Sequence, residues 1–153
     1  MPAIRRILFP TDFSERAETA WSYARLMAER FGTEVVLLHV MQEPVAMLPE
    51  SSLAVAPPAI NIAELTSAAE EGLRRLEVNE PARIVDRIVC NGPAAEEIVR
   101  YAKDLEADLV VLGTHGRTGI AHALLGSVAE RVVRRAPCAV MTVRPNCHGA
   151  NEN

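Results

Sequence analysis

Short apolar runs alternate along this chain with longer segments of helical periodicity. Several of the runs, such as VVLLHV and LVVL, are apolar almost throughout, which is typical of strands that are covered on both faces. Because strands and helices alternate, we predict an α/β fold in which an open parallel sheet has helices on both faces. The predicted strands are Ile4–Phe9, Glu34–Val40, Arg83–Val89, Asp108–Leu112 and Cys138–Val143.

The helical segments carry apolar residues at spacings of three and four. The first has two candidate N-caps, Asp12 and Ser14, and Asp12 with Glu15 has the spacing of a capping box. Gly32 follows the same segment as a stop signal. The predicted helices span about 14–31, 62–76, 93–105 and 127–135.

The length of 153 residues suits one domain. We place that domain at residues 1–145 and predict a disordered tail at 146–153. Residues 42–60 contain four prolines and no clear period, and they are long for a connection in so small a domain. We interpret them as a mobile surface loop, with a lid or a partner-binding segment as the alternative.

Composition excludes several classes of protein. With 49% hydrophobic but only 4% aromatic residues, the core should be aliphatic. A net charge of −4 and a pI near 5.6 argue against nucleic-acid binding. The three cysteines fit neither zinc nor redox spacings, and Cys90 and Cys138 read as small core residues. No apolar run is long enough for a signal peptide or a membrane span, so we predict a cytoplasmic protein without a membrane partner. His39 is expected to be a satisfied core histidine rather than a ligand.

The candidate site follows from the predicted sheet. Ligands of open parallel sheets bind beyond the carboxyl ends of the strands, where the winding reverses. The richest such segment, GTHGRTGIAHALLGS, starts at Gly113 and holds half of the eight glycines of the chain. Glycine frees backbone N–H groups to approach an anion, and Ser127 opens a helix whose amino end favours phosphate. The segment is neither a P-loop nor a dinucleotide fingerprint, and a glycine-rich turn that only connects a strand to a helix is the alternative.

The glycine spacing Gly113-x2-Gly116-x9-Gly126-Ser127 resembles the ATP-binding signature of the universal stress protein family. The opening ILFPTDFSERAETA and the later segments ADLVVLGTHGRTG and LLGSVAERVVRRAPCAVMTVRP are also similar to that family. The resemblance covers residues 4–145 in order and is weakest at 42–60. It implies a three-layer, Rossmann-like fold of the adenine nucleotide alpha hydrolase type, with a five-stranded parallel sheet in the order 3-2-1-4-5.

The resemblance also implies roles for individual residues. Pro10 and Thr11 would line an adenine pocket, and Val40 would offer its backbone to the adenine edge. Asp12 would accept from a ribose hydroxyl or approach a metal ion, with a simple N-cap as its alternative. The loop around the ribose and phosphates would be formed by Gly113, Thr114, His115, Gly116, Arg117, Thr118 and Gly119. The phosphate-binding helix start would be formed by Gly126, Ser127, Val128 and Ala129, with Ser127 capping that helix or donating to phosphate.

The expected cofactor is ATP, with ADP and AMP as alternatives, and Mg²⁺ held mainly by the nucleotide, because no metal-ligand spacing is found. The leading hypothesis is a nucleotide-responsive regulatory or stress-response protein. A slow ATPase and a nucleotide-free dimeric interaction protein are the alternatives, and no catalytic residue is assigned. The apolar last strand would need cover, and the resemblance implies a homodimer through it. The sequence leaves open the exact nucleotide, the protein partner and the pathway.

Overall fold

The computed structural model of the chain describes residues 3–42, 61–76, 83–114 and 125–144. The predicted alternation of strands and helices is confirmed, with ends that move by one or two residues. The strands are β1 Arg6–Pro10, β2 Glu34–Met41, β3 Arg83–Asn91, β4 Leu109–Gly113 and β5 Ala139–Val143. The helices are α1 Glu15–Phe31, α2 Ile62–Arg75, α3 Ala94–Asp104 and α4 Ser127–Arg135.

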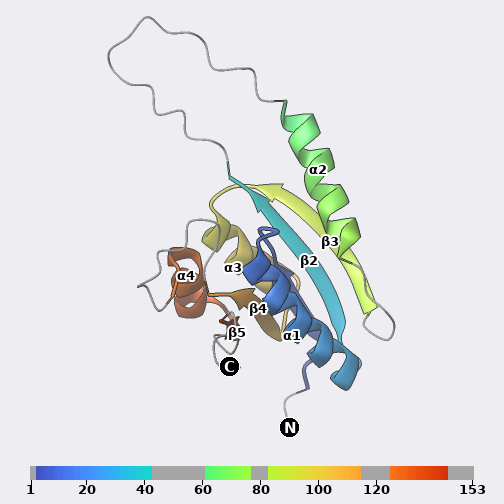
Figure 1. Ribbon diagram of the computed structural model, residues 1–153. Helices are drawn as coiled ribbons and strands as arrows, with labels where there is room; N and C mark the ends of the chain where they lie inside the picture. The colour runs from blue at the N-terminus through green and yellow to red at the C-terminus, as the bar shows by residue number, and fades with distance from the viewer. Residues whose placement is uncertain (1–2, 43–60, 77–82, 115–124, 145–153) are drawn as a thin grey trace, which may run out of the picture.

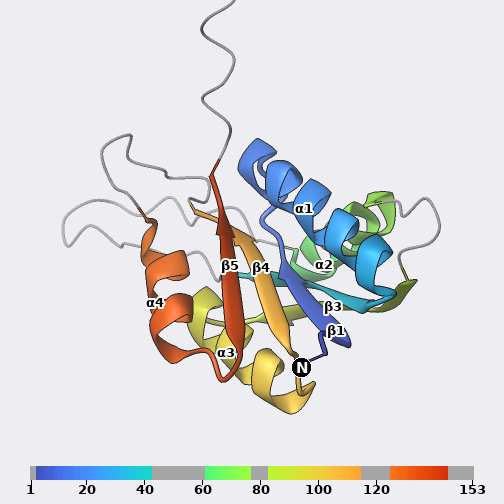
Figure 2. The same cartoon turned by 90° about the horizontal axis from the view of Figure 1, so that it is seen from below.

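The strands form one parallel sheet in the order β3-β2-β1-β4-β5, as predicted (Figure 1). Helices α1 and α2 cover one face of the sheet, and α3 and α4 cover the other (Figure 2). The order reverses between β1 and β4, which are neighbours in the sheet although α1, β2, α2, β3 and α3 separate them in the chain. The carboxyl ends of these two strands are therefore where the fold predicts a ligand site.

Two apolar clusters fill the space between the layers, and both are mainly aliphatic, as predicted. On the α1 face, Ala20, Ala24 and Ala28 have no exposed surface, so small side chains let this helix lie close to the sheet. Among the buried residues of this cluster, the aromatic pair is Phe9 and Trp21, whose ring centroids are 5.0 Å apart. Burial of strands on both faces explains why the runs are continuous in hydrophobicity rather than alternating.

The amino end of α1 confirms one of its two predicted N-caps. Ser14 is the N-cap, and its Oγ accepts a hydrogen bond from the Ala17 N–H at 3.3 Å. Asp12 lies further out, where its Oδ1 accepts from the Ser14 N–H at 3.0 Å and from the Ser14 hydroxyl at 2.6 Å. The capping box of Asp12 with Glu15 is therefore wrong, because Asp12 orients the cap and does not cap the helix. At the other end, Gly32 adopts the left-handed conformation at φ 63°, which confirms the stop signal.

Some predictions concern segments that the structure does not describe. The loop predicted at 42–60, apart from Gln42, and the tail predicted at 146–153 lie outside the described residues. Among the helices that are described, none is both long and apolar enough to cross a bilayer.

Candidate functional site

The first feature of the site is the early end of the ladder between β1 and β4. The two strands pair at Ile7 with Leu109 and at Leu8 with Val110. Beyond these pairs, β1 continues to pair with β2, and β4 continues to pair with β5. The Arg6 carbonyl accepts from the Asp108 N–H at 2.9 Å. Because alternate residues of a strand point their N–H and C=O groups to the same side, Pro10 also faces β4. Proline has no N–H to donate, so the ladder ends and the strands separate at the predicted place.

The second feature is an unpaired stretch of backbone on β2. The Glu34 N–H donates to the Arg5 carbonyl and the Leu38 carbonyl accepts from the Thr11 N–H, each at 2.9 Å. In a parallel strand, the N–H and C=O groups of alternate residues point toward the same neighbouring strand. The N–H and C=O of Val40 therefore also point toward the β1 side. The chain of β1 has turned away by then, and among the described residues no backbone group pairs with Val40 on that side. Both a donor and an acceptor are therefore presented there.

His39 contacts the carbonyl at which the ladder between β1 and β2 would continue to Val40. The next bond would join the Val40 N–H to the Thr11 carbonyl, but that oxygen lies 2.8 Å from His39 Nδ1. Because a carbonyl can only accept, Nδ1 carries the proton. The imidazole also stacks on the Phe13 ring, with centroids 4.5 Å apart. His39 is half-buried, so it lies at the edge of the core rather than inside it as predicted, and its Nδ1 is hydrogen-bonded to the carbonyl that would accept from the Val40 N–H.

The turn between β1 and α1 is fixed by its own side chains. Thr11 is buried, and its Oγ1 accepts from the Phe13 N–H at 3.0 Å. Phe13 has φ 60°, a left-handed conformation that is uncommon for a bulky residue. One Asp12 oxygen is used by Ser14, while no described residue donates to the other. The alternative that Asp12 is a simple N-cap is wrong, because Ser14 caps the helix, while the contact of Asp12 with a ribose hydroxyl or a metal ion stays a prediction.

Gly113, at the end of β4, has a packing role. A Cβ at this position would lie 3.2 Å from the Arg16 carbonyl oxygen, so the absence of a side chain lets the first turn of α1 approach the strand. The next residue, Thr114, is buried and donates its N–H to the Val143 carbonyl at 3.0 Å. The structure thus brings the end of β4 against the start of α1, as the topology predicts.

The amino end of α4 presents uncapped backbone. Its N-cap is Gly126, which makes no side-chain cap hydrogen bond, and Ser127 is the first helical residue and is exposed. The suggestion that Ser127 caps this helix is therefore wrong, because Gly126 occupies the cap position. Ala129 is buried and anchors the turn, with Val128 half-buried beside it. An uncapped first turn retains N–H groups that favour an anion.

A hydrogen bond of 2.6 Å from the Gly126 N–H to the Thr114 carbonyl ties the end of β4 to the start of α4. The loop between them contains the remaining predicted site residues, which lie outside the described residues: His115, Gly116, Arg117, Thr118 and Gly119. Their contact with a nucleotide stays a prediction. The ends of this loop are nevertheless placed beside the strand reversal.

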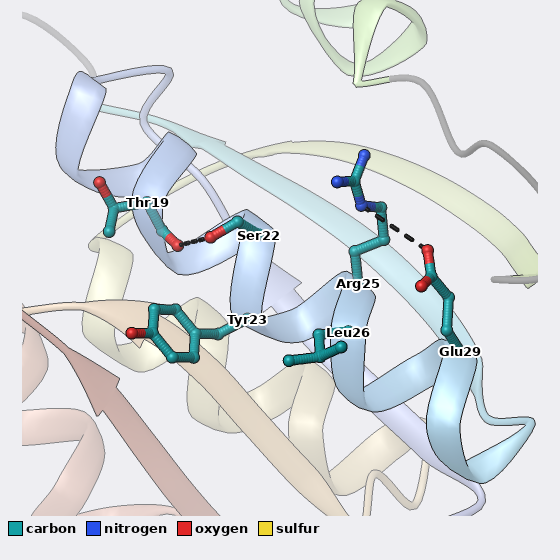
Figure 3. A pocket seen from close by; sticks show the side chains of 6 residues that line it. All are labelled: Thr19, Ser22, Tyr23, Arg25, Leu26 and Glu29. Atoms are coloured by element: carbon teal, nitrogen blue, oxygen red, sulfur yellow. Dashed lines mark hydrogen bonds and ion pairs between the residues drawn. The ribbon is translucent and has the colours of Figure 1, made fainter.

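Other features of the described residues do not add to the site. Cys90 and Cys138 were predicted to be small core residues, but both are half-buried and pack against the edge of the core. Partial burial raises the pKa of both thiols. No described group of three or more His, Cys, Asp or Glu side chains could hold a metal ion. A hollow of about 450 Å³ lies on the outer side of α1, and the predicted site residues do not line it (Figure 3).

Comparison with known proteins agrees with this fold. Residues 3–144 match the sequence profile of the universal stress protein family. Universal stress protein MJ0577 of Methanocaldococcus jannaschii is 31% identical over 153 residues, covering 92% of this chain and 94% of the relative.

Solved structures give the same result. A structure of MJ0577 covers 95% of this chain and 99% of its own, with a TM-score of 0.78 and 29% identity. A universal stress protein in complex with cAMP covers 94% of this chain and 98% of its own, with a TM-score of 0.66 and 23% identity. At that identity, the second structure shows only that the fold is shared.

Proposed function

This chain belongs to the universal stress protein family, and we propose that it is an ATP-binding member that acts as a nucleotide-responsive regulatory protein. The proposed site lies beyond the carboxyl ends of β1, β2 and β4, between the Thr11–Ser14 turn and the start of α4. A universal stress protein of the same fold has been solved in complex with cAMP. In that protein, the fold therefore binds an adenine nucleotide.

The observation that carries the proposal is the unpaired donor and acceptor of Val40. Adenine presents an amino donor at N6 beside a ring-nitrogen acceptor, which match a backbone C=O and N–H respectively. Guanine presents the O6 acceptor where adenine has its amino donor, so the same backbone pair opposes it. Selectivity for adenine would then arise from backbone polarity alone.

The uncapped start of α4 supports the phosphate half of the proposal. Its first-turn N–H groups and the exposed Ser127 hydroxyl can donate to phosphate oxygens. Mg²⁺ would be coordinated largely by the phosphates, with the spare oxygen of Asp12 as the one carboxylate ligand that the described site offers. Magnesium would neutralise phosphate charge, while the protein positions the nucleotide.

Titration calorimetry with ATP, ADP, AMP and GTP tests this function. We expect ATP to bind in the presence of Mg²⁺, AMP to bind more weakly, and GTP to bind least. Ser127→Ala should weaken ATP binding while leaving AMP binding nearly unchanged if that hydroxyl donates to the outer phosphates. No binding at millimolar ATP, or equal affinity for ATP and GTP, would refute the proposal.

A homodimer through β5 is a second part of the proposal. β5 is an edge strand of largely apolar sequence, and Val133 of the adjacent α4 is 48% exposed. An apolar edge needs cover, and a second copy of the chain can supply it. Val140→Lys should shift the sedimentation coefficient from dimer to monomer, whereas Val85→Lys on the opposite edge strand β3 should not. An unchanged Val140→Lys dimer would argue for another interface.

A further inference from the structure

The turn between β1 and α1 contacts α2 where the Phe13 ring lies against Gly72. A Cβ at Gly72 would lie 2.7 Å from Phe13 Cζ, 2.8 Å from Cε1 and 3.2 Å from Cε2. Real side chains essentially never pack so closely, so this position has no room for even a methyl group. Glycine is also unfavourable inside a helix, and the contact with Phe13 gives a physical reason for its presence in α2.

The Phe13 ring is constrained on several sides. Its backbone is left-handed, with φ 60°, and its N–H donates to Thr11 Oγ1 at 3.0 Å. The ring stacks on His39 and packs against the same core cluster that contains Leu73 of α2. A displacement of the ring would therefore disturb the stacked His39 imidazole, which is hydrogen-bonded to the Thr11 carbonyl in the turn.

Helix α2 is less firmly anchored than the turn it contacts. Its buried residues are Ala69 and Leu73, while Ile62 and Leu65 of its first turn are 59% and 49% exposed. A helix held through so few buried side chains can shift at lower cost than α1, which buries five residues. The position of α2 and the geometry of the turn are therefore linked through the Phe13–Gly72 contact.

We propose that the Phe13–Gly72 contact couples α2 to the nucleotide site. When Gly72 of α2 lies against the Phe13 ring, the ring stays in place and the turn keeps the conformation that binds the nucleotide. By reciprocity, a bound nucleotide fixes the turn and so stabilises α2 in its position against the Phe13 ring. This inference rests on the proposed function, and it adds Gly72 as a positioning residue and α2 as the element through which the site is regulated.

Gly72→Ala separates this coupling from a purely structural role. Helix propensity alone predicts that alanine stabilises α2, with no loss of affinity. Coupling predicts that the methyl group displaces the ring and that ATP binds roughly tenfold more weakly, within the range of typical coupling between sites. Ser67→Ala is the matched control, because it also adds helix propensity to α2 but lies at an exposed position.

A double-mutant cycle with Phe13→Gly locates the effect. Glycine adopts the left-handed conformation readily, so this variant keeps the turn possible while it removes the ring. Whatever the ATP affinity of Phe13→Gly, adding Gly72→Ala should change it by less than about twofold. An equal loss from Gly72→Ala in both backgrounds would overturn the coupling.

Hydrogen exchange of the α2 amides measures the reverse direction. Saturating ATP should slow exchange over 62–75 in the wild type and in Ser67→Ala, but not in Phe13→Gly. Thermal melting checks that each variant folds. If Gly72→Ala does not fold, the comparison of hydrogen exchange between the wild type and Phe13→Gly tests the coupling by itself. If the wild type binds no ATP, the proposed function and this inference both fail. If the wild type binds and Gly72→Ala binds equally well, only the coupling fails.

Discussion

His39→Phe should lower ATP affinity about fivefold although His39 lies in a strand beside the site. The substitution keeps an aromatic ring to stack on Phe13, where the present centroid distance is 4.5 Å. It removes the 2.8 Å hydrogen bond to the Thr11 carbonyl. Without that bond to orient it, we expect the carbonyl to turn toward the Val40 N–H and form the next bond of the β1–β2 ladder.

The size of the loss in ATP affinity follows from competition between adenine and the Thr11 carbonyl for the Val40 N–H. A typical internal hydrogen bond contributes about 1 kcal/mol, and adenine must break such a bond before it can use the Val40 N–H. A loss of about 1 kcal/mol corresponds to roughly fivefold in the dissociation constant. The free energy of unfolding should change by less than about 1 kcal/mol, because the new ladder bond replaces the lost one.

Titration calorimetry with ATP, together with urea denaturation, measures both quantities. His39→Asn is the matched control, since the asparagine side-chain amide places an N–H close to the position of Nδ1 and lacks the aromatic ring. We expect His39→Asn to bind ATP within about twofold of the wild type. Wild-type affinity in His39→Phe, or an equal loss in His39→Asn, would refute the assignment of His39 to the Thr11 carbonyl.

Two further predictions concern residues that hold the frame of the site. Gly113→Ala should destabilise the protein by about 1–3 kcal/mol in urea denaturation, because its Cβ would lie 3.2 Å from the Arg16 carbonyl oxygen; an unchanged midpoint would contradict this packing. Hydrogen bonds from the Arg5 and Arg6 N–H groups, at 2.8 and 3.0 Å, lower the pKa of Asp108. The resulting stability is present above the ordinary pKa and is lost as the pH falls through the lowered folded value. Asp108→Asn should therefore reduce the fall in stability below about pH 4, and an identical pH profile would count against this role.

The sheet was predictable because its determinants are local and repeated. Continuous apolar runs mark strands that are buried on both faces, and helical spacing marks the covering layers. The sequence leaves the α1 cap undecided because Asp12 and Ser14 both suit the position. Between them lies Phe13 in the left-handed conformation, and a bulky residue gives no local signal for that conformation.

The candidate site could be located from the sequence only where topology determines it. Pro10, Thr11 and Gly113 are candidates because they lie at the carboxyl ends of predicted strands, and the family resemblance supplies the reversal between β1 and β4. Gly72 was not identified, because its importance arises from a ring far away in the sequence. A glycine inside a helical pattern looks like a weak helix former, and only the packed structure shows the Phe13 ring in the space where a side chain would lie.

The described part of the site is built from backbone groups that neighbouring strands leave unpaired. Pro10 cannot donate to β4, and His39 is hydrogen-bonded to the Thr11 carbonyl that the next bond to β2 would use. Each feature lies at the carboxyl end of β1, where one of its two ladders ends. A chain with the same glycine loop but with a residue that donates at position 10, or without a donor at position 39, could close the ladder over the adenine position. Under the proposed function, the glycine spacing would report on phosphate binding alone, while the residues that interrupt the β1 ladders would govern whether the fold can receive the base.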